Sequence, residues 1–194
     1  MKFVGFYDYT VILTYLSLVS SVIGMVFANR DAFLGAILCL LVAGICDAFD
    51  GTVARTKKNR TEDEKTFGIQ LDSLCDVVSF GVFPAFLCHC LGVETIVGII
   101  ILCIYCICAV IRLAFFNVQE AKRQQVEEGC GKSYRGLPVT SISIIFPLLF
   151  PLYFLIPGNI FRILLHIMPA VVAFLFILDI PIKKFDVKRL FAGK

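Results

Sequence analysis

Four aspartates are the residues of this chain best suited to chemistry, because they stand in two pairs within an otherwise apolar sequence. Asp47 and Asp50 are three positions apart and Asp72 and Asp76 are four apart, so each pair would share one face of a helix. Four carboxylates that converge repel one another unless cations lie among them. Oxygen ligands select hard ions such as Mg²⁺ or Mn²⁺, and two such ions about 3.5 to 4 Å apart can hold a phosphoryl group. The spacing therefore predicts a site for divalent cations, with two ions expected.

The elements that must position these aspartates are membrane-spanning helices. Hydrophobic residues make up 59% of the 194 residues and charged residues only 17%, which is too apolar for an ordinary soluble domain. Apolar runs of about 17 to 25 residues have the length that a helix needs to cross a hydrocarbon core. Six such runs are predicted, over residues 10–29, 32–54, 72–91, 94–118, 138–156 and 160–181. We therefore expect an all-α integral membrane protein with a single domain over residues 1–194, and no nucleic acid as a partner.

The basic residues indicate which side of the membrane each end of the chain occupies, since lysine and arginine near the spans stay on the cytoplasmic side. With six spans, fifteen of the 18 lysines and arginines fall on the side that holds both termini and the loops after spans two and four. Only Arg30 and Arg162 fall on the other side, and Arg112 lies within a span. Both termini and the four aspartates are therefore expected to face the cytoplasm, in a multi-pass protein of the cell membrane.

The residues around the aspartates suit a phosphate ligand. Gly51 and Ala54 keep side-chain bulk away from the second span where a ligand would approach, and Gly68 does the same ahead of the third span. Arg55 offers a planar fork of donors for phosphate. Close helix packing also explains small residues in a membrane protein, so each of them alone is weak evidence. The charged run over residues 57–65 is expected to form a solvated loop.

The string DAFDGTVAR, followed by Gly68, Asp72 and Asp76, resembles the signature of the CDP-alcohol phosphatidyltransferase family. That signature is D-x-x-D-G-x-x-A-R followed by G-x-x-x-D-x-x-x-D, and all eight of its fixed positions are present. The resemblance implies six transmembrane helices, a homodimer, and transfer of a phosphatidyl group from a CDP-lipid to an alcohol, with CMP leaving. It also implies that the metal ligands are Asp47, Asp50, Asp72 and Asp76, that Asp76 is in addition the base for the incoming hydroxyl, and that Gly51, Ala54, Arg55 and Gly68 line the CDP-lipid pocket.

Further strings point to the alcohol acceptor. The run DSLCDVVSFG, the string RLAFFN from Arg112 and the string GLP from Gly136 resemble the phosphatidylserine synthases of the same family, which favours L-serine. The predicted acceptor-binding residues are Ser79, Arg112, Asn117, Lys132 and Arg135. Arg112 is expected inside span four, where a guanidinium needs an anionic partner. Phe115 stands where the family often has a second basic residue, and a single guanidinium suits a carboxylate. Glycerol 3-phosphate, inositol or an inositol phosphate stays open as an alternative acceptor.

The end of the chain carries a basic segment that suits a membrane surface. The basic residues of positions 183–194 flank Phe185, Leu190 and Phe191, as expected for a segment that lies on an anionic leaflet. Anionic membrane lipids are therefore predicted partners. Retention of positive charge on the cytoplasmic side explains the same residues equally well.

A divalent-cation transporter would also carry aspartates within the membrane. Such a protein places its ion site near the bilayer midplane, between related halves that contain broken helices. Here all four aspartates fall at one cytoplasmic end of the predicted spans, and the sequence has no matching half. Enzymatic group transfer is therefore favoured over transport.

Overall fold

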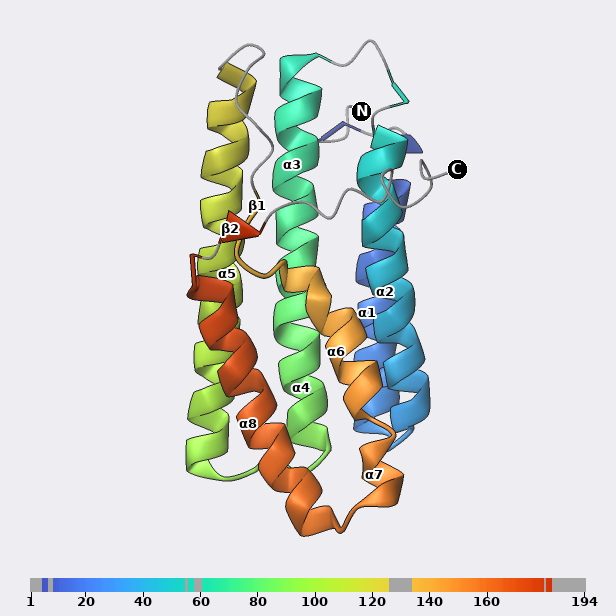
Figure 1. Cartoon of the computed structure of the whole chain (residues 1–194). Helices are drawn as coiled ribbons and strands as arrows, with labels where there is room; N and C mark the ends of the chain where they lie inside the picture. Colours follow the sequence, from blue (N-terminus) through green and yellow to red (C-terminus); the bar gives the residue numbers. More distant parts are fainter. Residues whose placement is uncertain are drawn as a thin grey trace, which may run out of the picture.

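The chain forms a bundle of helices that run along a common direction (Figure 1). A computed structural model describes residues 5–6, 9–54, 56–57, 61–125, 134–179 and 181–182. The α-helices are α1 (Ile12–Asn29), α2 (Phe33–Ala54), α3 (Glu62–Asp76), α4 (Phe83–Cys90), α5 (Ile96–Gln125), α6 (Ile142–Leu149), α7 (Leu152–Leu155) and α8 (Gly158–Ile177). The remaining elements are the 3-10 turns Tyr9–Val11 and Val139–Ser141, the π-helical segment Val77–Val82, and the strands β1 (Tyr134–Arg135) and β2 (Pro181–Ile182).

Five helical stretches in the described part of the chain are long and apolar enough to cross a membrane: Tyr9–Asn29, Phe33–Val53, Glu62–Cys90, Ile96–Ala121 and Gly158–Ile177. They confirm the prediction of a helical, multi-pass membrane protein. The fifth predicted run instead forms a shorter apolar stretch, which is broken between α6 and α7. Pro147 lies inside α6 and Pro151 lies at the break, and proline lacks the N–H that continues a helix. Six complete spans and the cytoplasmic location of the termini therefore stay predictions.

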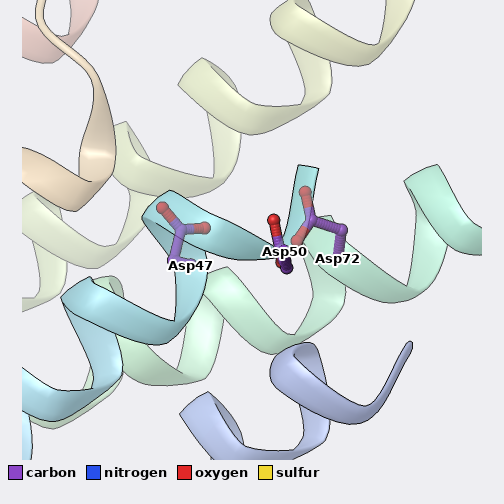
Figure 2. Close-up of side chains that lie close together, drawn as sticks. All are labelled: Asp47, Asp50 and Asp72. Carbon is purple, nitrogen blue, oxygen red and sulfur yellow. The ribbon is translucent and has the colours of Figure 1, made fainter. Parts of the chain in front are cut away.

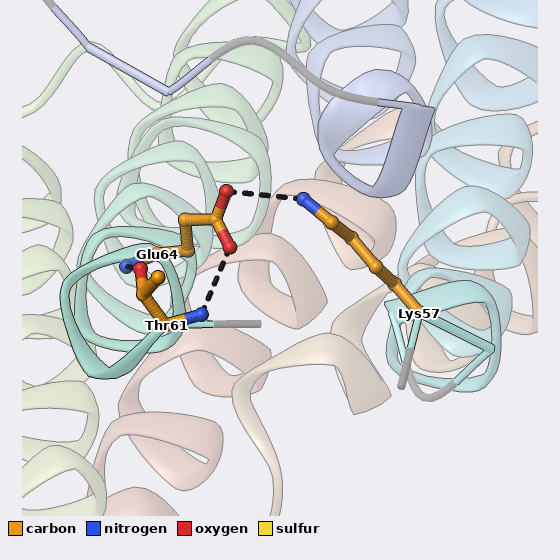
Figure 3. Close-up of polar contacts among 3 residues, drawn as sticks. All are labelled: Lys57, Thr61 and Glu64. Atoms are coloured by element: carbon orange, nitrogen blue, oxygen red, sulfur yellow. Dashed lines mark hydrogen bonds and ion pairs between the residues drawn. The ribbon is translucent and has the colours of Figure 1, made fainter. Parts of the chain in front are cut away.

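A capping box sets the start of the helix that carries Asp72 and Asp76 (Figure 3). The Thr61 hydroxyl accepts a hydrogen bond from the Glu64 N–H at 3.2 Å, and Glu64 Oε2 accepts one from the Thr61 N–H at 3.0 Å. These two bonds satisfy backbone donors that have no partner within the helix. Lys57 adds an ion pair of 3.1 Å to the other Glu64 oxygen. The capping box thus stabilises the start of α3 at Glu62.

The early start of α3 corrects two predictions. Residues 62–65, which were expected in a solvated loop, form the first turn of the helix. The third apolar run, expected to begin at residue 72, is the later part of a continuous helix that extends from Glu62 to Cys90. Asp72 and Asp76 consequently lie about three and four turns inside that helix rather than at its start.

Removal of the capping hydroxyl is expected to loosen the first turn of α3. Replacement of an N-cap threonine by alanine costs about 1 kcal/mol. In Thr61→Ala we therefore expect the amide of Glu64 and its neighbours to exchange with deuterium about fivefold faster, measured by hydrogen exchange in detergent. Thr66→Ala is the matched control, because Thr66 is exposed on the same helix and is not part of the capping box. Equal exchange rates in the two variants would contradict the role of the box.

A π-helical segment follows Asp76 directly and leads into α4. Pro84 has no N–H, so the carbonyl of Phe80 cannot form the usual helical bond four residues ahead. The hydroxyl of Tyr105, in α5, donates a hydrogen bond to this carbonyl instead. Both side chains are buried. The contact therefore fixes α5 against the aspartate-bearing helix at the level of the π-helical segment.

Apolar side chains fill the interior of the bundle and also cover much of its outside. The largest fully buried side chains are Tyr105, Phe80, Phe83, Phe146, Phe161 and Phe176. On the outer faces, large apolar residues such as Leu38, Ile107 and Phe174 are more than half exposed. A soluble monomer rarely exposes apolar surface on this scale, whereas contact with lipid requires it. The outside of the bundle is therefore suited to a bilayer.

A two-residue antiparallel ladder, which the all-α prediction did not include, joins two distant segments beside α5 (Figure 1). Tyr134 pairs with Ile182 and Arg135 pairs with Pro181. β1 lies just before Gly136 and α6, whereas β2 follows α8. The ladder therefore brings the chain beyond the last helix next to the predicted acceptor string that begins at Gly136.

Candidate active site

Three of the four aspartates come together between α2 and α3. Asp47 and Asp50 lie on α2 and Asp72 lies on α3, and all three side chains are half-buried. One carboxylate oxygen from each residue lies within 4.8 Å of the oxygens of the other two (Figure 2). The structure thus brings members of both pairs into one cluster, as their spacing in the sequence indicated.

Asp76 extends this cluster toward the interior of the bundle. Its side chain is 7% exposed, which makes it the most buried of the four aspartates. The carboxyl group of Asp76 contacts that of Asp47, and the carboxyl group of Asp50 contacts that of Asp72. The group of oxygens that share the 4.8 Å separation does not include Asp76. Asp76 therefore stands at the inner edge of the site, beside the three other carboxylates.

The donor set of the cluster fits a divalent cation. Asp72 Oδ1 is buried and has no hydrogen-bond partner among the described residues. A buried carboxylate oxygen without a partner is costly unless an ion or a donor reaches it. Carboxylates from two helices provide the hard oxygen ligands that Mg²⁺ and Mn²⁺ prefer. The aspartate cluster could therefore bind a divalent metal ion.

Helix α1 supplies polar contacts that the sequence analysis missed. Thr14 Oγ1 donates a hydrogen bond to Asp50 Oδ2 at 3.2 Å, and Ser17 Oγ donates one to Ser79 Oγ at 3.5 Å. Ser79, a predicted acceptor-binding residue, is fully buried at this contact. One signal could have revealed this face: Thr14, Ser17 and Ser21 recur every three or four residues within an apolar span, and all are buried.

The structure describes some, but not all, of the residues predicted to bind the CDP-lipid. A Cβ added to Gly51 would meet no neighbouring atom within 4 Å, so open space adjoins α2 beside Asp50. Gly68 is half-buried in α3. Ala54 is the last residue of α2, but its side chain and the whole of Arg55 lie outside the described residues. The structure thus shows open space at Gly51, and the roles of these residues stay predictions.

The predicted acceptor residues do not form one group in the structure. Asn117 lies beside the aspartates, because its Oδ1 accepts a hydrogen bond of 2.9 Å from Ser73 on α3. Arg135 is part of β1, with its side chain outside the described residues. Lys132 and the basic tail of residues 183–194 lie wholly outside them. Asn117 is therefore the acceptor candidate that the structure ties to the helix of Asp72 and Asp76.

Arg112 lies against two segments that are distant from it in the sequence. A Cβ on Gly136 would lie 3.0 Å from Arg112 Nη1, so the guanidinium packs directly on the glycine backbone. Gly136 has a φ of 75°, and the same Cβ would lie 2.9 Å from the carbonyl oxygen of Leu178. Asp179, the next residue, is close enough to interact electrostatically with Arg112. Three segments that are distant in the sequence therefore meet at this guanidinium.

The fold and the site together define a multi-pass membrane protein with a candidate divalent-metal centre of aspartates at α2 and α3. Residues 9–179, most of the chain, match the family described as CDP-alcohol phosphatidyltransferase. The chain therefore belongs to the CDP-alcohol phosphatidyltransferase family.

Relatives with curated names are similar to parts of the chain. The CDP-diacylglycerol–serine O-phosphatidyltransferase of Saccharomyces cerevisiae is 38% identical over 108 residues, which are 54% of this chain and 38% of the relative. The archaetidylserine synthase of Methanothermobacter thermautotrophicus is 36% identical over 126 residues, 64% of this chain and 47% of the relative. A CDP-diacylglycerol–serine O-phosphatidyltransferase of Bacillus subtilis is 39% identical over 89 residues, 45% of this chain and 48% of the relative. The chain thus spans less than half the length of each of these relatives. No solved structure gives a significant match.

Proposed function

We propose that this protein transfers a phosphatidyl group from a CDP-lipid, such as CDP-diacylglycerol, to the hydroxyl of L-serine and releases CMP. The observation that carries the proposal is the aspartate cluster, in which Asp72 Oδ1 is buried without a partner among the described residues. The relatives named for serine transfer support the choice of acceptor. The same reaction with glycerol 3-phosphate, inositol or an inositol phosphate is the second candidate.

In the proposed reaction, Asp47, Asp50 and Asp72 would hold two ions of Mg²⁺ or Mn²⁺, with Asp76 as a further ligand. Bound divalent cations would neutralise the charge of the diphosphate and of the carboxylates. Asp76 takes the proton of the serine hydroxyl, whose oxygen forms a bond to the phosphorus that carries the lipid. The bond from this phosphorus to the CMP oxygen breaks, and CMP leaves. Transfer at phosphorus needs little covalent assistance, so the main task of the site is alignment.

Side chains and space around the cluster support this alignment. The hydrogen bond from Thr14 orients Asp50, and Gly51, the next residue of α2, borders open space. We propose that the diphosphate occupies this space, with Gly68, Ala54 and Arg55 around the CDP-lipid. The acyl chains remain in the bilayer, against the exposed apolar faces of the bundle.

The proposed setting is the cell membrane, with the aspartates and both termini facing the cytoplasm. The excess of lysine and arginine on one side of the predicted spans supports this orientation. In this arrangement α6 and α7 together make the sixth crossing. We further propose that the protein acts as a homodimer and that its basic tail contacts anionic lipids.

Purified protein supplied with CDP-diacylglycerol and Mn²⁺ or Mg²⁺ tests the proposal. Parallel reactions contain L-serine, glycerol 3-phosphate, inositol or inositol phosphate, and both CMP release and the lipid product are measured. We expect product with serine, loss of activity with a chelator, and recovery when Mn²⁺ is added back, because the carboxylates repel a diphosphate in the absence of cations. Product with only a phosphorylated acceptor would overturn the serine assignment, and full activity in metal-free buffer would overturn the role of the ions.

Transport of divalent cations is the more distant candidate, and the embedded aspartates are the observation that favours it. Vesicles that contain the protein separate the two functions. Uptake of Mn²⁺ without any CMP release from added CDP-lipid would support transport and overturn the proposed transfer reaction.

A further inference from the structure

We propose that Asp179 forms a subsite for an ammonium group, so that Asp179 and Arg112 together recognise a zwitterionic amino alcohol as the acceptor. The inference rests on the proposed phosphatidyl transfer and names the feature of the acceptor that the site selects. Arg112 lies on α5, whereas Asp179 follows α8 at a distance of 67 positions in the sequence. The β1–β2 ladder holds the segment after α8 beside the loop that packs on Arg112.

The Arg112 guanidinium packs against the backbone at Gly136. Gly136 presents no side chain, and a Cβ at this position would stand 3.0 Å from Arg112 Nη1 and 2.9 Å from the Leu178 carbonyl oxygen. The φ of 75° at Gly136 is in the left-handed region, where glycine is favoured. The loop and the segment after α8 therefore close on the guanidinium from one side, and this closure brings Asp179 to it.

The packing of α5 against α3 and the π-helical segment places Arg112 at the depth of the proposed base. Ser73 forms a hydrogen bond to Asn117, and Gly81 packs against Ala109. From the first contact to the second, the position rises by eight residues on one helix and falls by eight residues on α5. The two helices therefore run antiparallel in matching steps. The interval between these contacts sets Arg112 level with residues 77 and 78, within about one turn of Asp76. The proposed acceptor site therefore lies at about the level of that carboxylate along the bundle.

The charges of the pair match those of serine. A guanidinium can grip a carboxylate with two parallel hydrogen bonds, and a carboxylate accepts hydrogen bonds from an ammonium. Without acceptor, Arg112 and Asp179 interact with each other, and a bound zwitterion would offer each of them a new partner of opposite charge. A dianionic phosphate would instead meet Asp179 as a like charge. The pair therefore favours serine over glycerol 3-phosphate and inositol phosphate.

Exposure indicates how the acceptor enters. Asp179 is exposed, whereas Arg112 is half-buried. The ammonium group of an amino alcohol can therefore meet the accessible Asp179 while its carboxylate reaches the deeper guanidinium. In the proposed binding mode the hydroxymethyl group points toward the aspartate cluster.

Three acceptors that differ by one charged group test the subsite. CMP release is measured with L-serine, with 3-hydroxypropanoate, which lacks the ammonium, and with ethanolamine, which lacks the carboxylate. An analogue that is not turned over is measured as a competitive inhibitor of serine transfer. In Asp179→Asn we expect the KM for serine to rise about tenfold, while the affinity for 3-hydroxypropanoate changes by less than about twofold. In Arg112→Gln we expect serine and 3-hydroxypropanoate to bind more weakly and ethanolamine to be unaffected.

Two further variants distinguish loss of the ammonium subsite from a general structural effect of the substitution. Asp179→Glu keeps the charge and is expected to retain most of the serine affinity. Asp63→Asn removes an exposed carboxylate from the first turn of α3 and is expected to leave the serine KM unchanged. An unchanged serine KM in Asp179→Asn, or an equal loss of affinity for serine and 3-hydroxypropanoate, would overturn the subsite. Absence of CMP release by the unaltered protein with every acceptor would overturn the proposed function and the subsite with it.

Discussion

Replacement of Asp72 by asparagine is expected to lower CMP release at least about 10³-fold, which corresponds to about 4 kcal/mol of lost transition-state stabilisation. Asp72 contributes to the three-aspartate cluster, and its Oδ1 is buried with no partner among the described residues. Asparagine keeps the shape of the side chain but removes its charge and turns one oxygen into an NH₂ group, which does not bind a cation. The change therefore removes a metal ligand with little disturbance of packing.

The same variant should show a changed response to metal in a second measurement. Binding of Mn²⁺ to the folded state raises the melting temperature of the protein, and this rise should be much smaller in Asp72→Asn. In metal-free buffer the variant should melt at or above the temperature of the unaltered protein, because fewer like charges face one another in the cluster. Such a pattern distinguishes loss of a ligand from misfolding. Unchanged activity together with an unchanged response to Mn²⁺ would contradict the proposed metal site.

Asp63→Asn is the matched control for Asp72→Asn. Asp63 lies on the same helix, in its exposed first turn, and is not part of the cluster. Loss of a favourable charge at a helix N-terminus costs about 0.3 to 1 kcal/mol of stability. The control variant should therefore keep normal CMP release and a normal response to Mn²⁺.

Replacement of Asp76 by asparagine is expected to lower kcat by about 10² to 10⁴-fold, the usual contribution of a general base. The affinity for the CDP-lipid should change much less, because the proposed base acts on the acceptor hydroxyl. The position of Asp76 supports this separation: it is the most buried of the four aspartates and contacts Asp47 from the inner edge of the cluster. Steady-state kinetics with serine, combined with direct binding of the CDP-lipid to the variant, provides the measurement.

A neighbouring residue serves as the control for Asp76→Asn. Ser73 is buried on the same helix and donates its hydrogen bond to Asn117 rather than to an aspartate. Ser73→Ala should therefore reduce kcat by less than about tenfold, the effect of losing one ordinary hydrogen bond. If Asp76→Asn lost CDP-lipid binding and the response to Mn²⁺ along with turnover, Asp76 would act mainly as a metal ligand and not as the base.

The sequence by itself determined the membrane character of the protein and the pairing of its aspartates. A helix in lipid must satisfy its own backbone hydrogen bonds, so the length of each apolar run indicates a span, and five of the six predicted runs correspond to long apolar helices. The spacing of three and four residues within the aspartate pairs likewise follows from helical periodicity. Both rules are local, which is why they can be applied without knowledge of the packing.

Only the tertiary structure decided which side chains complete the site. A capping box at Thr61 lengthens α3, and proline breaks the stretch formed by α6 and α7. Thr14 reaches Asp50 from another helix, and Asp179 reaches Arg112 from beyond the last one. These contacts depend on how helices cross and on where a two-residue ladder forms. The periodic spacing of Thr14, Ser17 and Ser21 marks a polar face of α1, but it does not indicate which distant residues that face contacts.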